Sequence, residues 1–158
     1  MIYKYIKFSI SISIISWIVG MIINAFLKKT EFHTKHLSNL NFINIKFLNK
    51  IIGIFVFKWI VKNTPLKFFN QKLTIKKKIE KSDLISLRND MTVSEIDHLI
   101  GFVFVSIFAL VKFIDFNFLF GLMIMLANVP LNLYPSLLQQ ENKRRIDRLL
   151  KKNIAIIN

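Results

Sequence analysis

The chain has 158 residues, which is enough for one domain of modest size. Hydrophobic residues make up 53% of it and charged residues 20%, the mean hydropathy is +0.46, and the formal net charge is +14. These values are compatible only if apolar and charged residues are segregated along the chain. This favours a membrane protein with basic surfaces on anionic lipid over a nucleic-acid-binding protein. The lack of cysteine excludes disulfides, thiol nucleophiles and thiolate metal sites.

The first apolar stretch covers residues 8–27 and is long enough to cross a bilayer as a helix. Basic residues flank it, with Lys4 and Lys7 before it and Lys28 and Lys29 after it. A cleaved signal peptide would also have a basic start and an apolar run, but no small residues at cleavage-site spacing stand at the end of this one. We therefore expect an uncleaved N-terminal transmembrane helix.

A basic segment over residues 42–80 follows. Its apolar part, 42–61, is interrupted by lysines, which predicts amphipathic helices lying in the headgroup plane. Trp59 suits the aromatic belt at a membrane surface, and Pro65 ends or redirects the first of these helices. We expect the segment to lie on the membrane without crossing it.

Two apolar helices are predicted next, over 95–114 and 116–138, as the arms of a hairpin that turns near Asp115. Thr92 or Ser94 is expected to cap the first arm, because a hydroxyl there accepts from the first free amides of a helix. Thr92 and Glu95 together also fit a capping box.

Two prolines, Pro130 and Pro135, interrupt the second arm, so both a hairpin that crosses fully and a re-entrant one remain open. Residues 139–158 are expected to form a basic tail. Because basic segments stay in the cytoplasm, we expect this tail and the 42–80 segment on the cytoplasmic side of the membrane. The whole chain, 1–158, is then a single all-α integral membrane domain. The start of the hairpin should lie level with the start of the tail at the cytoplasmic surface.

A row of amide side chains runs from the second arm into the tail: Asn128, Asn132, Gln139 and Asn142. Their spacing is close to that of one helical face. Amides at membrane depth are costly to bury unless they find partners. The row is therefore a candidate site for a polar group. The alternative is a protein without catalytic function, in which the row packs helices, binds a partner or holds a small homo-oligomer.

Glu95 and His98 are three residues apart and share a helical face. A carboxylate beside an imidazole orients the ring and raises its basicity, as a general base requires. The alternative is that Glu95 is a helix N-terminal charge and His98 an interfacial histidine. His33 and His36 are also three apart, but no ligand pattern surrounds them, and we expect no metal site.

Asn132-Leu-Tyr134-Pro135 and the residues after it resemble the tail signature of the glycosyl-4,4'-diaponeurosporenoate acyltransferase family, N-x-Y-P and then Q-R-Y-N-R-x-R. The further positions in register with it are Gln139, Asn142, Lys143 and Arg145. Gln140 and Glu141 depart from the signature, and Lys143 replaces an arginine. Glu95-Ile-Asp-His98 is similar to the family's E-x-x-H at the start of its hairpin. The resemblance spans residues 58–145.

The resemblance implies an enzyme of the bacterial inner membrane that transfers a fatty acyl group to a sugar hydroxyl of a glycosylated carotenoid or related glycolipid. We expect no bound cofactor, an acyl thioester of coenzyme A or acyl carrier protein as co-substrate, and membrane lipids and an amphiphilic glycosylated acceptor as partners. His98, oriented by Glu95, is then the expected base. The expected substrate-binding residues are Asn128, Asn132, Tyr134, Gln139, Asn142, Lys143 and Arg145. The amides would donate to the sugar or the developing oxyanion, and the two cations would bind the donor's phosphates.

Overall fold

The computed structural model describes the backbone of residues 1–40, 59, 63 and 80–157, and the side chains of these residues up to 151. The described residues form helices and no strand: α1 (Ile2–Leu27), η1 (His33–Leu37), α4 (Lys81–Ile114), α5 (Phe118–Asn128), η3 (Val129–Leu133) and α6 (Tyr134–Ile157). The predicted interfacial segment, 42–80, lies outside the described residues apart from 59, 63 and 80.

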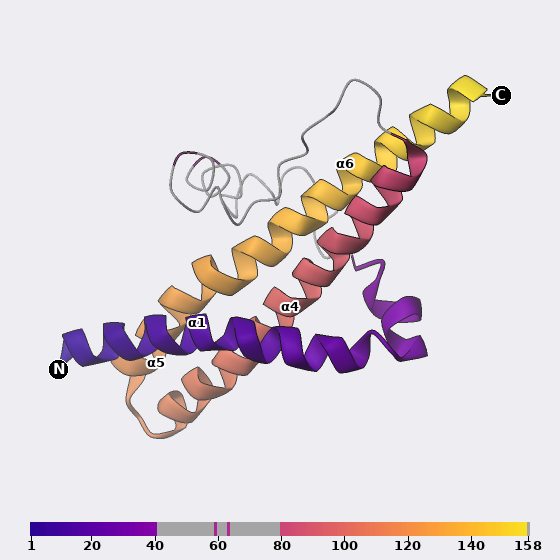
Figure 1. The fold of residues 1–158 in the computed structure, drawn as a ribbon. Coiled ribbons are helices and arrows are strands. Elements are labelled where there is room, and N and C mark those ends of the chain that lie inside the picture. Colours follow the sequence, from indigo (N-terminus) through magenta and orange to yellow (C-terminus); the bar gives the residue numbers. More distant parts are fainter. Residues whose placement is uncertain (41–58, 60–62, 64–79, 158) are drawn as a thin grey trace.

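The long helix α4 is the centre of the molecule and contacts α1, α5 and α6. α6 runs beside α4 in the opposite direction, and α1 crosses the pair (Figure 1). α5 lies near the start of α1, at the end of the molecule where α4 turns back. The start of α4 and the end of α6 lie side by side and extend beyond the point where α1 crosses them.

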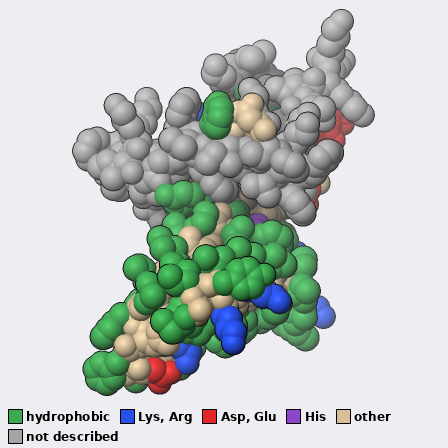
Figure 2. Space-filling view, turned by 90° about the vertical axis from the view of Figure 1, so that its left-hand side faces the viewer, with side chains coloured by type: hydrophobic (Ala, Val, Ile, Leu, Met, Phe, Trp, Pro, Cys, Tyr) green, Lys and Arg blue, Asp and Glu red, His purple; other side chains and the backbone are tan. Residues whose placement is uncertain are grey.

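Three stretches are long and apolar enough to cross a membrane: Ile2–Leu27, Lys81–Ile114, and Phe118–Lys151. Their outer faces carry exposed apolar side chains, such as Ile18, Val103 and Leu122. Figure 2 shows this hydrophobic surface in green on the described residues, in the lower part of the view. The predicted all-α class is confirmed, with an N-terminal apolar helix followed by an apolar hairpin.

The hairpin turns where it was predicted. Phe116 adopts a left-handed conformation with φ 57°. The amides of Phe116 and Asn117 donate to the Phe113 and Lys112 carbonyls at 3.1 and 2.9 Å, and these bonds end α4. The beginning of α1 is attached to this turn, because the ring of Tyr5 stacks on Phe120 with centroids 4.2 Å apart. Asn117 also donates to the Tyr5 hydroxyl at 3.3 Å.

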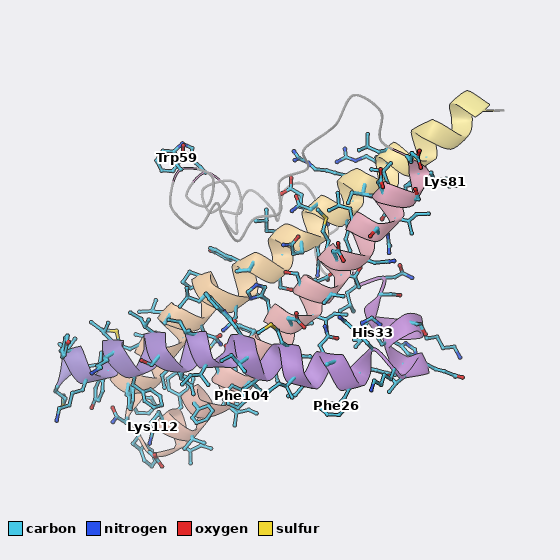
Figure 3. The ribbon with its side chains drawn as sticks, in the orientation of Figure 1. Phe26, His33, Trp59, Lys81, Phe104 and Lys112 are labelled. Carbon is cyan, nitrogen blue, oxygen red and sulfur yellow. The ribbon has the colours of Figure 1, made fainter. Side chains whose placement is uncertain are left out.

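The first arm begins much earlier than predicted. α4 starts at Lys81, and the capping box that opens it joins Glu80 and Asp83. Thr92 lies within the helix, where its hydroxyl donates to the Arg88 carbonyl at 3.0 Å. The predicted start near Glu95 was therefore wrong. Figure 3 shows Lys81 and Lys112 near opposite ends of this helix, with Phe104 between them.

Packing against α6 explains the longer helix. Leu84 and Met91 of α4 form a buried cluster with Ile146 of α6. Arg88 pairs with Asp147 at 2.6 Å. Because α4 holds it in this way, the predicted tail, 139–158, is a continuation of helix α6 through Ile157. α4 is about 50 Å long, well beyond the bilayer core of about 30 Å.

The two prolines of the second arm are accommodated within continuous helix. Residues 129–133 form the π-helical segment η3, with Pro130 in its first turn. Pro135 has no N–H, so the Leu131 carbonyl loses its α-helical donor. The indole Nε1 of Trp17 donates to that carbonyl at 3.2 Å instead. The proline therefore creates a docking point for α1.

Candidate functional site

Polar side chains line the contact between α4 and the stretch from the end of α5 through η3 into α6, and we call this group the polar seam. Its members are Glu95, His98, Asn128, Asn132, Ser136, Gln140 and Lys143. His98 is half-buried and the others are buried. Apolar clusters close the seam on both sides, around Val105 and Ile124 toward the turn and around Met91 and Ile146 toward the chain end. The seam is therefore a polar layer inside an apolar helix bundle.

The level of the seam along α1 follows from two close contacts. Gly20 lies against the backbone of Asp97, and Ser16 lies against Gly101. His98 is therefore level with residues 16–20 of α1, about 10–16 Å along the axis from the end of that helix. An ionisable side chain packed against the interior of an apolar helix marks a candidate functional site.

His98 contacts two other elements. Its ring meets the edge of the Trp17 indole, with centroids 6.0 Å apart and planes at 83°. The ring also interacts with the Asn132 carboxamide of η3. The Nδ1 atom of His98 is buried. Residues of α1 and η3 thus hold a histidine that α4 supplies.

Asn132 is held by two further hydrogen bonds. Its Nδ2 donates to Ser16 Oγ at 2.9 Å and to Asn128 Oδ1 at 2.9 Å. Asn128 in turn donates through Nδ2 to the Phe102 carbonyl at 3.0 Å and to Ser106 Oγ at 3.2 Å. Both protons of the Asn132 amide therefore have acceptors inside the protein. Donation to a substrate from this group would require a rearrangement.

Glu95 forms a buried ion pair with Lys143, and the two side chains are 0% and 4% exposed. Lys143 also donates to the Ser38 carbonyl at 3.4 Å, which attaches the residues after η1 to α6. The pair confirms that the start of the hairpin and the start of the tail face each other. Glu95 was expected to orient His98. In the structure its carboxylate pairs with Lys143. The residue that interacts with the His98 ring is Asn132. Lys143 is enclosed and is not placed to meet a phosphate from solvent.

The remaining predicted residues lie on other faces of α6. Gln139 and Asn142 are buried, and Asn142 Nδ2 donates to Gln139 Oε1 at 3.4 Å. Tyr134 packs against Leu138. Arg145 is exposed and lies 3.8 Å from Glu141. The predicted single row is thus divided, with Asn128 and Asn132 in the seam and Gln139 and Asn142 beside it.

Some residues of this region were not predicted. Ser136 and Gln140 belong to the seam, while Ser16 and Trp17 come from a helix that the sequence identified only as an anchor. The signal for α1 was present, because its small and polar residues recur on one face: Ser9, Ser13, Ser16, Gly20 and Asn24. Such a stripe in an apolar helix marks a close helix–helix contact.

The two other histidines lie on η1. Burial and the neighbouring Lys28 lower the pKa of His33. Within the described parts of the chain, no three His, Asp or Glu side chains form a group that would hold a metal ion.

The fold and the seam together define a helical membrane protein with an ionisable site enclosed by three helical elements. The family model of glycosyl-4,4'-diaponeurosporenoate acyltransferase matches residues 28–152, and the chain belongs to that family. The family is named as an acyltransferase of a glycosylated carotenoid. No curated protein and no solved structure matches the chain.

Proposed function

We propose that the protein transfers a fatty acyl group from a thioester to a sugar hydroxyl of a glycosylated carotenoid or related glycolipid. The observation that carries the proposal is His98, a half-buried histidine of the polar seam that interacts with Trp17 and Asn132. Family membership supplies the reaction type. Both reactants are amphiphiles, so a site reached from the membrane suits them.

In the proposed reaction His98 accepts the proton of the sugar hydroxyl, and the hydroxyl oxygen attacks the thioester carbonyl. The carbon–sulfur bond then breaks, the thiol leaves with a proton, and an ester remains. Gln139 and Asn142, beside the seam, retain amide hydrogens that could donate to the sugar or to the developing oxyanion. Arg145 is exposed and is the better placed of the two predicted cations to meet the donor's phosphates.

The proposal is tested by mass spectrometry of pigments from a host that already makes the glycosylated carotenoid. We expect wild-type protein to produce a species heavier by one fatty acyl group. His98→Gln at equal membrane abundance should lower its amount by about 100-fold or more, the usual contribution of a general base. Unchanged product in the variant would remove His98 from the reaction.

A non-catalytic packing role is the second candidate, because several amides join helices. Asn24 donates to the Val93 carbonyl at 3.1 Å and to Asp97 at 2.6 Å, and Asn128 and Asn132 also bond across helices. Under this alternative, His98→Gln and Gln139→Leu would change protein abundance, and no new pigment would form with wild-type protein.

A further inference from the structure

Asn132 and His98 each carry a buried polar atom at the contact between α4 and η3. The Asn132 carboxamide interacts with the His98 ring, and a Cβ on Gly101, about one turn along α4 from His98, would lie 2.9 Å from Asn132 Oδ1. Asn132 Oδ1 and His98 Nδ1 are both buried, and neither has a hydrogen-bond partner among the described residues. A buried donor or acceptor is costly to leave unpaired, so the protonation of the ring should match what Asn132 offers it.

The Phe102 carbonyl, at the far end of this chain of hydrogen bonds, decides whether Asn132 presents its oxygen or its NH₂ group to His98. The Phe102 carbonyl can only accept, so the Asn128 atom 3.0 Å from it is the NH₂ group. The Oδ1 of Asn128 therefore points to Asn132 and can only accept, so it faces the NH₂ group of Asn132, at 2.9 Å. The orientation of both amides follows from one backbone carbonyl.

A second acceptor strengthens this orientation. Ser16 donates its own hydroxyl proton to the Ser13 carbonyl at 2.6 Å, so toward Asn132 its Oγ can only accept. Both neighbours of the Asn132 NH₂ group are thus acceptors. The carbonyl oxygen of Asn132 is left for His98, and the ring must donate to it.

We propose that the chain Phe102–Asn128–Asn132 holds the proton of neutral His98 on Nδ1, leaving the lone pair on Nε2 to accept the proton of the acceptor hydroxyl. Asn132, Asn128 and Ser16 are then positioning residues for the base, a role that an asparagine also serves beside histidine in other catalytic triads. The catalytic use of Nε2 rests on the proposed function. The position of the proton does not.

This assignment makes α1 part of the site. Ser16 lies in α1, outside the residues 28–152 that the family model matches. Gly101 completes the arrangement, because a Cβ there would lie 2.9 Å from Asn132 Oδ1 and 3.1 Å from Ser16 Oγ. The absence of a side chain at that position allows the three groups to meet.

The test is ¹⁵N NMR of the full-length protein, labelled at histidine and purified in detergent, at pH 8, where an ordinary histidine is neutral. The chain has three histidines, and the spectrum of His98→Gln identifies the signals of His98. We expect one nitrogen with the shift of a protonated Nδ1 and one with the shift of an unprotonated Nε2. A proton on Nε2, or an averaged pair of shifts, in wild-type protein would overturn the proposal without any variant.

Variants then test the chain of hydrogen bonds. Asn132→Leu removes the acceptor, and Asn128→Leu removes the group that orients it, so both should move the His98 proton toward Nε2 and lower kcat with little change in KM. Ser13→Ala is the matched control, because Ser13 is equally buried on the same face of α1 and donates to the Ser9 carbonyl at 2.8 Å. It should leave the shifts and kcat unchanged. An unchanged His98 spectrum in folded Asn132→Leu would contradict the proposal. A protein with the expected wild-type shifts but no acyl transfer would contradict only the proposed function.

Discussion

Glu95 and Lys143 are opposite charges buried against each other between α4 and α6. Removing both charges from water is expensive, and their attraction offsets that cost only while both are present. The pair therefore fixes the register of the two helices more than it adds net stability. It also holds the residues after η1 through the Ser38 carbonyl.

Replacing one partner of this ion pair should lower the free energy of unfolding more than replacing both partners. We expect Lys143→Met to lower the free energy of unfolding in detergent by about 3–5 kcal/mol, because it leaves the Glu95 carboxylate buried without its partner. The double variant Glu95→Gln, Lys143→Met should recover most of the loss. Arg148→Met, at an exposed position of the same helix, is the control and should change stability by about 0.5 kcal/mol or less. A double variant no more stable than Lys143→Met would contradict this account.

At the scale of elements, the crossing of α1 and α4 depends on a missing side chain. A Cβ on Gly20 would lie 2.2 Å from the Asp97 carbonyl oxygen and 3.0 Å from its carbon. Those are backbone atoms of a helix, and they cannot move aside. The close approach brings Asn24 within reach of Asp97 and Trp17 within reach of His98.

Gly20→Ala should therefore push the two helices apart, with a cost of about 1–3 kcal/mol or more. We expect lower membrane abundance and a lower unfolding temperature. Gly121→Ala is the matched comparison, because its Cβ would meet the Phe113 ring at 2.7 Å, and a side chain can shift where a backbone cannot. Equal effects of the two substitutions would show that α1 does not approach α4 as described.

The sequence predicted those elements and contacts whose signal is local. The apolar stretch of α1, the turn near Asp115 and the amides Asn128 and Asn132 on a buried face were all readable from periodicity. The start of α4 was not, because the capping pattern at Thr92 and Glu95 indicated a later start. The helix begins at Lys81 instead, where Leu84 and Met91 pack against Ile146 of α6.

The partners of Glu95 and His98 also could not be predicted locally. Spacing put the two on one helical face, but the nearest opposite charge to Glu95 lies in another helix, at Lys143. The contribution of Trp17 depends on the carbonyl that Pro135 frees, and this joins two residues far apart in the chain. Such contacts come from the packing of three helices, which no single stretch of sequence encodes.

At the scale of the whole molecule, the helices predict a topology. The start of α1 and the turn at Phe116 lie at one end. The start of α4 and the part of α6 beyond Lys143 extend at the other, and this part of α6 is basic, with Arg144, Arg145, Arg148 and Lys151. Because basic segments stay inside, we expect the turn outside the cell membrane and the end of α6 in the cytoplasm.

The absence of native cysteine allows a direct test of this topology. A membrane-impermeant maleimide applied to intact cells should label Asp115→Cys at the exposed turn, and label Arg148→Cys on α6 only after permeabilisation. The reverse pattern would place the predicted cytoplasmic segments outside the cell membrane.

The central claim is that the seam around His98 transfers an acyl group. The most direct measurement is ester formation by purified protein in lipid vesicles, supplied with an acyl thioester and the glycosylated carotenoid, for wild type and His98→Gln at equal folded amounts. The account predicts turnover by wild type and a rate lower by about 100-fold or more in the variant. Equal rates in the two proteins, or no ester from folded wild type, would contradict it.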